Sequence, residues 1–199
     1  WLTQRWIGKL GFDLAEQVCR QSISIPPLTI RTNTLRCSRE QLKERLQNEG
    51  YTVRQTLVSP VGLTLDKFGS LTNLKPLEEG WCYVEDEAAQ LVPFLLDVQP
   101  GQRLLDACAA PGGKSTHLAA LMRNEGEIVS MDRSAQRLKT LRENVEGLGI
   151  TCIRPKVGTW AGNVKLPLSL ASMLGEGFDG ILVDAPCSGL GVLRRHPEA

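Results

Sequence analysis

The chain has 199 residues, of which 42% are hydrophobic, enough to bury a core in one or two domains. No apolar run approaches the ~20 residues that a membrane-spanning helix needs, so we expect no membrane partner. The formal net charge is +1, but residues 1–60 hold nine basic and five acidic side chains. This basic excess indicates either a surface that faces a polyanion or an ordinary solvated surface.

The cysteines indicate the cellular compartment of the protein, and the first residues indicate whether the chain is part of a longer protein. The six cysteines form no Cys-x-x-Cys pair, so we expect no metal site. Their spread is typical of reduced thiols in a cytoplasmic compartment. The segment that begins at Trp1 resembles neither a signal peptide nor a translation start, so we expect the chain to be part of a longer protein.

The first 86 residues have the pattern of a helix followed by a small α+β domain. We expect a helix at residues 4–20, a strand at 28–34, a second helix at 39–48 and a second strand at 51–57. A group of short strands follows at 61–86. Apolar and polar residues alternate in the first strand, as in a strand that is buried on one face. Ser38 is the expected N-cap of the second helix, and Gly50 closes it.

From residue 87 the pattern changes to strands that alternate with helices. We expect helices at 87–96, 115–122 and 135–148, and strands at 103–106, 127–131, 150–157 and 178–183. This alternation predicts an α/β fold with a parallel sheet and right-handed crossovers. In such sheets, ligands bind at the carboxyl ends of the strands, near the point where the strand order reverses.

The loop after the first of these strands reads Asp106-Ala-Cys-Ala-Ala-Pro-Gly-Gly-Lys-Ser115. Its small residues let backbone approach a ligand closely, and it opens a helix whose N-terminal amides attract negative charge. It is not a Walker loop, because Cys108 stands where the first glycine would fall. The alternative is a tight turn with a purely structural role.

An acidic residue closes the next strand. Asp132 follows Gly113 by 19 residues, a spacing at which carboxylates accept hydrogen bonds from ribose hydroxyls. The alternative is that Asp132 caps the helix that begins near Ser134.

A third loop reads Asp184-Ala-Pro-Cys-Ser-Gly-Leu-Gly191, with a carboxylate and a thiol at a strand end. Cys187 is either a cleft residue or a small buried hydrophobe. The cluster Arg194, Arg195 and His196 either lowers its pKa or holds phosphate, or is an exposed helix start.

Together, the loops at 106–114 and 184–191 resemble the Sun/Fmu-like family of RNA 5-methylcytosine methyltransferases. Residues 28–35, Leu-Thr-Ile-Arg-Thr-Asn-Thr-Leu, resemble that family's RNA-recognition-like domain. The resemblance covers essentially the whole chain. It implies a smaller N-terminal α+β RNA-recognition-like domain within residues 1–86. Residues 87–199 would then form a Rossmann-like class I methyltransferase sheet, truncated after its fourth strand.

The resemblance also implies S-adenosylmethionine as the cofactor. The implied cofactor-binding residues are Cys108, Ala109, Ala110, Pro111, Gly112, Gly113, Lys114, Asp132 and Asp184. Of these, Asp132 would bind the ribose, and Asp184 would lie beside the methionine end and the target base. The family's acidic residue near the adenine has no counterpart after the third strand, where Thr159 and Asn163 are the alternatives.

The implied chemistry requires cysteine. Carbon 5 of cytosine is a poor nucleophile until a thiolate adds to carbon 6, and the base must be exposed or flipped out. By resemblance, Cys187 assists release, and the attacking cysteine is expected in a Thr-Cys motif beyond residue 199. The fragment alone is then expected to be inactive. Alternatively, Cys187 is itself the nucleophile, as the corresponding cysteine is in DNA cytosine methyltransferases.

The expected partner is RNA, with ribosomal RNA as the family-level expectation, and the expected state is a cytoplasmic monomer without a metal. Two other functions remain open. One is a catalytically inactive RNA-binding or assembly module of the same fold. The other is a nicotinamide-binding oxidoreductase, which the missing G-x-G-x-x-G motif disfavours.

Overall fold

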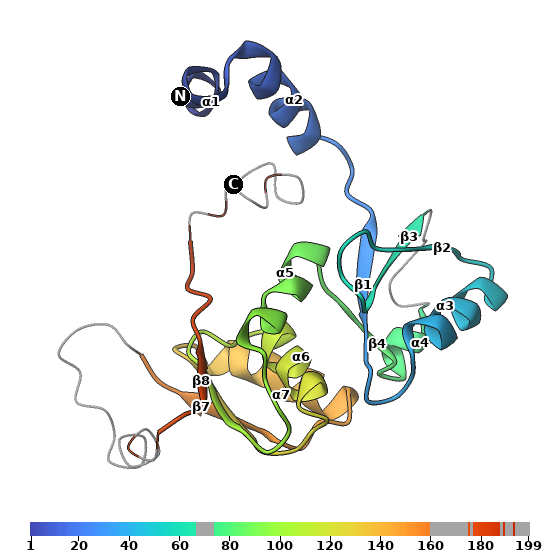
Figure 1. Ribbon diagram of the computed structural model, residues 1–199, viewed down its shortest axis with the longest axis vertical. Helices are drawn as coiled ribbons and strands as arrows, with labels where there is room; N and C mark the ends of the chain where they lie inside the picture. Colours follow the sequence, from blue (N-terminus) through green and yellow to red (C-terminus); the bar gives the residue numbers. More distant parts are fainter. Residues whose placement is uncertain (67–73, 160–174, 176, 188, 190–192, 194–199) are drawn as a thin grey trace. The chain divides into compact units, whose positions relative to one another are not determined.

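A computed structural model describes residues 1–66, 74–159, 175, 177–187, 189 and 193 of the chain. The chain divides into two compact units (Figure 1). One unit contains residues 1–27 and 186–199, and the other contains residues 28–185. Within the described ranges, every helix is too short or too polar to cross a bilayer.

The N-terminal segment forms two helices, α1 (Leu2–Leu10) and α2 (Phe12–Ser22), which Figure 1 shows in dark blue. The prediction of one continuous helix over 4–20 is therefore wrong. Gly11 separates the two helices with φ 78° and ψ 168°, a conformation outside the helical region. Apolar spacing continues through this break, so periodicity alone did not reveal it.

Four antiparallel strands form the first sheet of the 28–185 unit. They are β1 (Leu28–Thr32), β2 (Thr52–Gln55), β3 (Gly62–Asp66) and β4 (Cys82–Val84), in the order β2-β3-β1-β4. Helix α3 (Arg39–Asn48) buries Leu42 and Leu46 in the core of this sheet, and a short helix, α4 (Lys75–Glu78), precedes β4. The predicted cap is confirmed, because the Ser38 side chain accepts a hydrogen bond from the backbone N–H of Gln41.

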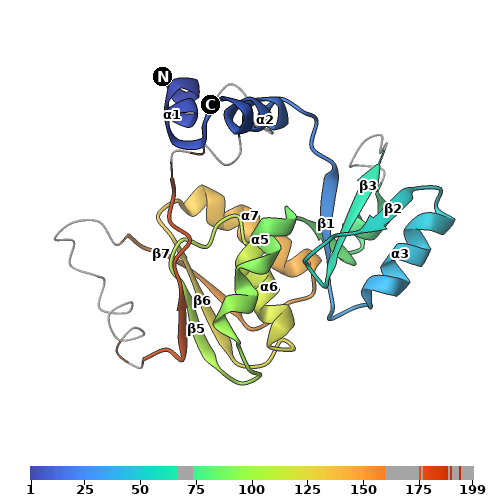
Figure 2. The ribbon, with the colours of Figure 1, turned by 45° about the horizontal axis from the view of Figure 1, so that its top comes forward.

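The central strand β1 is buried along its whole length, which differs from the predicted half-buried strand. Ile30 packs into the core with α3, whereas Arg31, on the opposite face, donates hydrogen bonds to residues of helix α6 (Gly113–Leu121). Helices α5 (Glu87–Leu91) and α6 lie between the two sheets in Figure 1 and Figure 2. The polar face of β1 thus meets protein instead of water.

The predicted helix over 87–96 also divides. Helix α5 ends at Leu91, and a 3₁₀ helix covers Pro93–Leu96. Pro93 has no backbone N–H to continue the α-helical ladder, and it stands at the start of the second segment.

The second sheet is parallel and has the order β7-β6-β5-β8. Its strands are β5 (Arg103–Asp106), β6 (Glu127–Asp132), β7 (Ile153–Val157) and β8 (Gly180–Leu182). Helix α6 and helix α7 (Ala135–Gly147) share one core with β5 and β6, through Leu118, Leu138 and Leu141. Strands β6 and β7 lie to one side of β5 and β8 lies to the other, so the strand order reverses at β5.

The predicted α/β sheet and the smaller N-terminal α+β fold are both confirmed. The predicted domain boundary at residue 86 falls between β4 and α5. Both sheets belong to the same compact unit, and the boundary stays a prediction.

Candidate functional site

A cavity of about 190 Å³ lies where the strand order reverses, at the carboxyl ends of β5 and β8. Its lining comes from the loops after these two strands and from β4. The lining residues are Tyr83, Val84, Glu85, Asp106, Cys108, Ala109, Ala110, Pro111, Gly113, Lys114 and Asp184. The structure thus brings most of the predicted loop residues together with Asp184, while Gly112 and Asp132 lie outside the lining.

The two glycines of the loop stand where little space is left for a Cβ. Gly112 has φ 111°, and a Cβ there would lie 3.1 Å from Cγ of Leu141. A Cβ on Gly113 would lie 2.8 Å from Oε1 of Glu85 and 3.2 Å from Cε1 of Tyr83. Backbone therefore approaches both α7 and β4 closely at the start of α6, whereas its close approach to a ligand stays a prediction.

Asp106, the last residue of β5, is a buried carboxylate in the cavity wall. One of its oxygens, Oδ2, accepts a hydrogen bond from the Ser115 hydroxyl at 2.6 Å. The other, Oδ1, accepts from the Cys108 backbone N–H at 3.4 Å. Burial raises the pKa of Asp106 to about 6, and the hydrogen bonds oppose this rise. Burial disfavours the ionised carboxylate of Asp106. A positively charged group of a ligand in the cavity would stabilise that ionised form and lower the pKa again.

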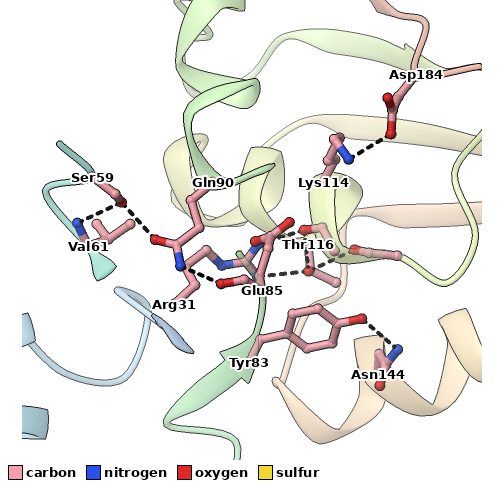
Figure 3. Close-up of polar contacts among 12 residues, drawn as sticks. Arg31, Ser59, Val61, Tyr83, Glu85, Gln90, Lys114, Thr116, Asn144 and Asp184 are labelled. Atoms are coloured by element: carbon pink, nitrogen blue, oxygen red, sulfur yellow. Dashed lines mark hydrogen bonds and ion pairs between the residues drawn. The ribbon is translucent and has the colours of Figure 1, made fainter. Parts of the chain in front are cut away.

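Lys114 and Asp184 join the two predicted loops. The Lys114 ammonium lies 2.6 Å from Oδ2 of Asp184, and Figure 3 shows this ion pair above the start of α6. The Lys114 side chain is 20% exposed and that of Asp184 is 52% exposed. The pair is therefore accessible from the cavity.

Asp132, the last residue of β6, connects the loop at 106–114 to the segment that follows β6. Its Oδ2 accepts from the Ala110 N–H at 3.3 Å, and its Oδ1 accepts from the Ser134 N–H at 2.9 Å. Arg137 forms an ion pair with it at 3.4 Å. Ser134, not Asp132, caps α7 by accepting from the Arg137 N–H, so the cap alternative is wrong. Ribose binding by Asp132 stays a prediction.

Cys187 lies in the unit that contains residues 1–27 and 186–199. It is exposed, so it is not the small buried hydrophobe of the alternative, and its sulfur accepts from the Gly189 N–H at 3.4 Å. Its role in release stays a prediction. Four further predicted residues lie outside the described part of the chain, namely Asn163, Arg194, Arg195 and His196.

Tyr83 and Glu85 are site residues that the sequence did not indicate. Tyr83 belongs to β4, a strand of the other sheet, Glu85 directly follows that strand, and no local motif marks either residue. Burial raises the pKa of the Glu85 carboxyl, while the charge of Arg31 opposes this. A larger hollow of about 510 Å³ lies beside them, between β4 and α7. Its wall includes Tyr83, whose hydroxyl accepts a hydrogen bond from Asn144 at 3.3 Å.

The charges of the site favour a cationic ligand. Three carboxylates line the cavity, but Glu85 forms an ion pair with Arg31 and Asp184 forms one with Lys114. The buried carboxylate of Asp106 is therefore the charge that a cationic group of a ligand would complement. Among the described residues, no group of three or more His, Cys, Asp or Glu side chains is placed to hold a metal ion. A ligand with cationic groups, held by backbone of the small loop residues, fits this wall.

Comparison with known proteins places these features in a family. A sequence model described as 16S rRNA methyltransferase RsmB/F matches residues 93–199. A second model, described as the ferredoxin-like domain of RsmF/B-like methyltransferases, matches residues 1–72. The first model covers all four strands of the parallel sheet, and the second covers β1, β2 and β3 of the antiparallel sheet.

Individual relatives agree. The chain is 36% identical to a probable ribosomal RNA small subunit methyltransferase B of Bacillus subtilis, over 100% of this chain and 43% of the relative. It is 37% identical to ribosomal RNA small subunit methyltransferase B of Pseudomonas syringae, over 92% of this chain and 39% of the relative. The crystal structure of a methyltransferase homolog protein from Pyrococcus horikoshii is 31% identical, with a TM-score of 0.81. That match covers 96% of this chain and 60% of that one. The chain thus spans about two fifths of the length of these two curated relatives.

Proposed function

Because the chain belongs to the 16S rRNA methyltransferase RsmB/F family, we propose that it supplies the S-adenosylmethionine-binding part of an RNA cytosine-5 methyltransferase. Ribosomal RNA is the proposed substrate. The observation that carries the proposal is the meeting of Lys114 and Asp184 in the cavity beside the 106–114 loop. These two segments carry the sequence resemblance, and they meet at the switch point where α/β sheets bind ligands.

The chemistry of the wall fits the cofactor. S-adenosylmethionine carries a sulfonium and an ammonium group, and the carboxylates of Asp106 and Asp184 complement such charges. We assign residues 108–114 to wrapping the cofactor and Asp132 to its ribose. Asp184 is assigned to the side that faces the methionine end and the target base. When bound, the cofactor supplies the methyl group.

The residues of this chain then prepare the reaction. Lys114 holds the half-exposed Asp184 carboxylate in one place, which orients it toward a base that has left its stack. We assign Cys187 to assisting the release of the methylated base, when the enzyme thiol leaves carbon 6. All six cysteines are free among the described residues, which supports a reducing compartment, and we propose the cytoplasm.

Titration calorimetry with S-adenosylmethionine tests the cofactor assignment. We expect the protein to bind it and the Asp132→Ala variant to lose most of the affinity. The matched control is Asp97→Ala, since Asp97 is exposed and lies outside the cavity lining. Absence of binding by the unaltered protein would refute the cofactor assignment and favour an inactive RNA-binding module.

Methyl transfer by the natural full-length protein tests the substrate. The protein is incubated with methyl-labelled S-adenosylmethionine and ribosomal RNA, and the digested nucleosides are analysed by mass spectrometry. We expect the label on carbon 5 of cytosine. Label that appears only on protein, DNA or a small molecule would contradict the proposal.

A further inference from the structure

An arginine of the N-terminal sheet contacts the start of the cofactor loop's helix. Arg31, on β1, is 2% exposed. Its Nη1 donates to Oε2 of Glu85 at 2.7 Å and to the carbonyl oxygen of Gly113 at 2.6 Å. Its Nη2 donates to the hydroxyl of Thr116 at 2.9 Å. Figure 3 shows Arg31, Glu85 and Thr116 side by side between β4 and α6.

This placement is unfavourable unless it is compensated. A buried guanidinium loses its hydration, and a positive charge at a helix N-terminus opposes the helix dipole. The carboxylate of Glu85 supplies the opposite charge in the same buried region. The planar guanidinium of arginine suits this arrangement, because it reaches three acceptors at once, one on Glu85 and two at the start of α6.

The contacts of Arg31 continue directly into the cavity wall. Gly113 and Glu85 both line the cavity, and Lys114 is the next residue along α6. The Thr116 hydroxyl lies 2.8 Å from the carbonyl oxygen of Gly112 and 2.9 Å from that of Gly113. Arg31 and Thr116 therefore hold both glycines of the loop through their carbonyl groups.

We propose that Arg31 is a positioning residue for the cofactor. It holds the Gly112–Gly113 turn in the shape that binds S-adenosylmethionine, so cofactor affinity depends on the N-terminal antiparallel sheet. This inference rests on the proposed function. It adds to that function a residue that lies 82 positions before Gly113 in the sequence and outside the methyltransferase sheet.

A neighbouring residue provides a matched control. Asn33 also links the antiparallel sheet to α7, since its Nδ2 donates to the carbonyl oxygen of Leu148, the C-cap of α7, at 3.0 Å and to that of Gly80 at 2.8 Å. Neither acceptor lines the 190 Å³ cavity. Asn33→Ala therefore breaks a contact between the antiparallel sheet and α7 without touching the loop at 106–114, whereas Arg31→Lys keeps the charge and loses the planar guanidinium.

The test uses the natural full-length protein, S-adenosylmethionine as the titrant, and hydrogen–deuterium exchange of residues 108–116. For Arg31→Lys we expect an affinity about 10-fold weaker and faster exchange in this segment, because small displacements of positioning groups carry large penalties. For Asn33→Ala we expect a lower unfolding midpoint and an unchanged affinity. Should Arg31→Lys fail to fold, Thr116→Val removes the hydroxyl that accepts from Arg31 and contacts the carbonyl oxygens of Gly112 and Gly113, and it is expected to weaken binding too.

Two results would overturn the inference while leaving the proposed function intact. One is a folded Arg31→Lys, or in its place Thr116→Val, that binds as tightly as the unaltered protein. The other is an Asn33→Ala variant that weakens binding as much as Arg31→Lys does. An unaltered protein that does not bind S-adenosylmethionine refutes the proposed function, and the inference falls with it.

Discussion

The ammonium of Lys114 lies 2.6 Å from a carboxylate oxygen of Asp184, although one follows β5 and the other follows β8. A pair with this exposure contributes only about 0–1 kcal/mol to folding. Its significance is therefore its position in the cavity wall, where it places a carboxylate on the side that we propose faces the target base.

We expect Asp184→Asn to reduce methyl transfer by about 100-fold, because it removes a charge from the proposed reaction site. The free energy of unfolding should change little, since Asp184 is half exposed. Initial rates and urea unfolding measure the two effects, and Asp97→Asn is the matched exposed control. Loss of activity together with equal loss of stability would assign Asp184 a structural role instead.

The second prediction concerns pH and Asp106. Its folded-state pKa of about 6 lies above the ordinary value of 3.8, so the unfolded chain loses the proton first as pH rises. The folded protein then loses stability between pH ~4 and pH ~6, by about 3 kcal/mol in all, and this loss is complete at higher pH. We expect Asp106→Asn to lack this loss, because it cannot ionise.

Urea unfolding of both proteins between pH ~4 and pH ~8 checks this prediction. The unfolding free energy of the unaltered protein, relative to Asp106→Asn, should fall across the lower part of that range and then level off. A difference that stays constant throughout would show that Asp106 ionises with an ordinary pKa.

The third prediction concerns the close approach of Gly113 to β4. Gly113→Ala places a Cβ 2.8 Å from Oε1 of Glu85, so we expect a loss of about 1–3 kcal/mol in unfolding free energy and weaker cofactor binding. Gly147→Ala, in α7, meets nothing within 4 Å and should be neutral or stabilising by up to about 1 kcal/mol. Thermal unfolding and calorimetry distinguish the two, and equal effects would contradict the steric argument.

The fourth prediction concerns the cap of α3. Ser38→Ala removes the acceptor for the Gln41 N–H and should lower the unfolding free energy by about 1 kcal/mol. Ser38→Asp keeps an acceptor and should retain most of the stability. Urea unfolding of the two variants is the measurement, and an alanine variant as stable as the aspartate variant would rule out the cap as a stabilising element.

Local signals were enough for much of the fold. The strand at 103–106 and the helix that begins at Ala135 were correctly predicted, because short-range periodicity and Ser or Gly at the ends determine such elements. The helices predicted over 4–20 and over 87–96 are each divided into two helices in the structure. A backbone conformation at Gly11 and the missing N–H of Pro93 interrupted patterns that remain periodic in sequence.

By itself, the sequence determined the α/β class, and it pointed to the loop at 106–114 and to Asp184 as candidate site residues, since each is a property of neighbouring residues. Only the tertiary structure decided that Glu85 joins the cavity wall and that Arg31 holds Gly113. These contacts join residues far apart in the chain, and no local pattern records which buried charge will meet which partner. The physical reason is that a buried arginine requires a compensating acceptor, and the packing of two sheets against α6 selects it.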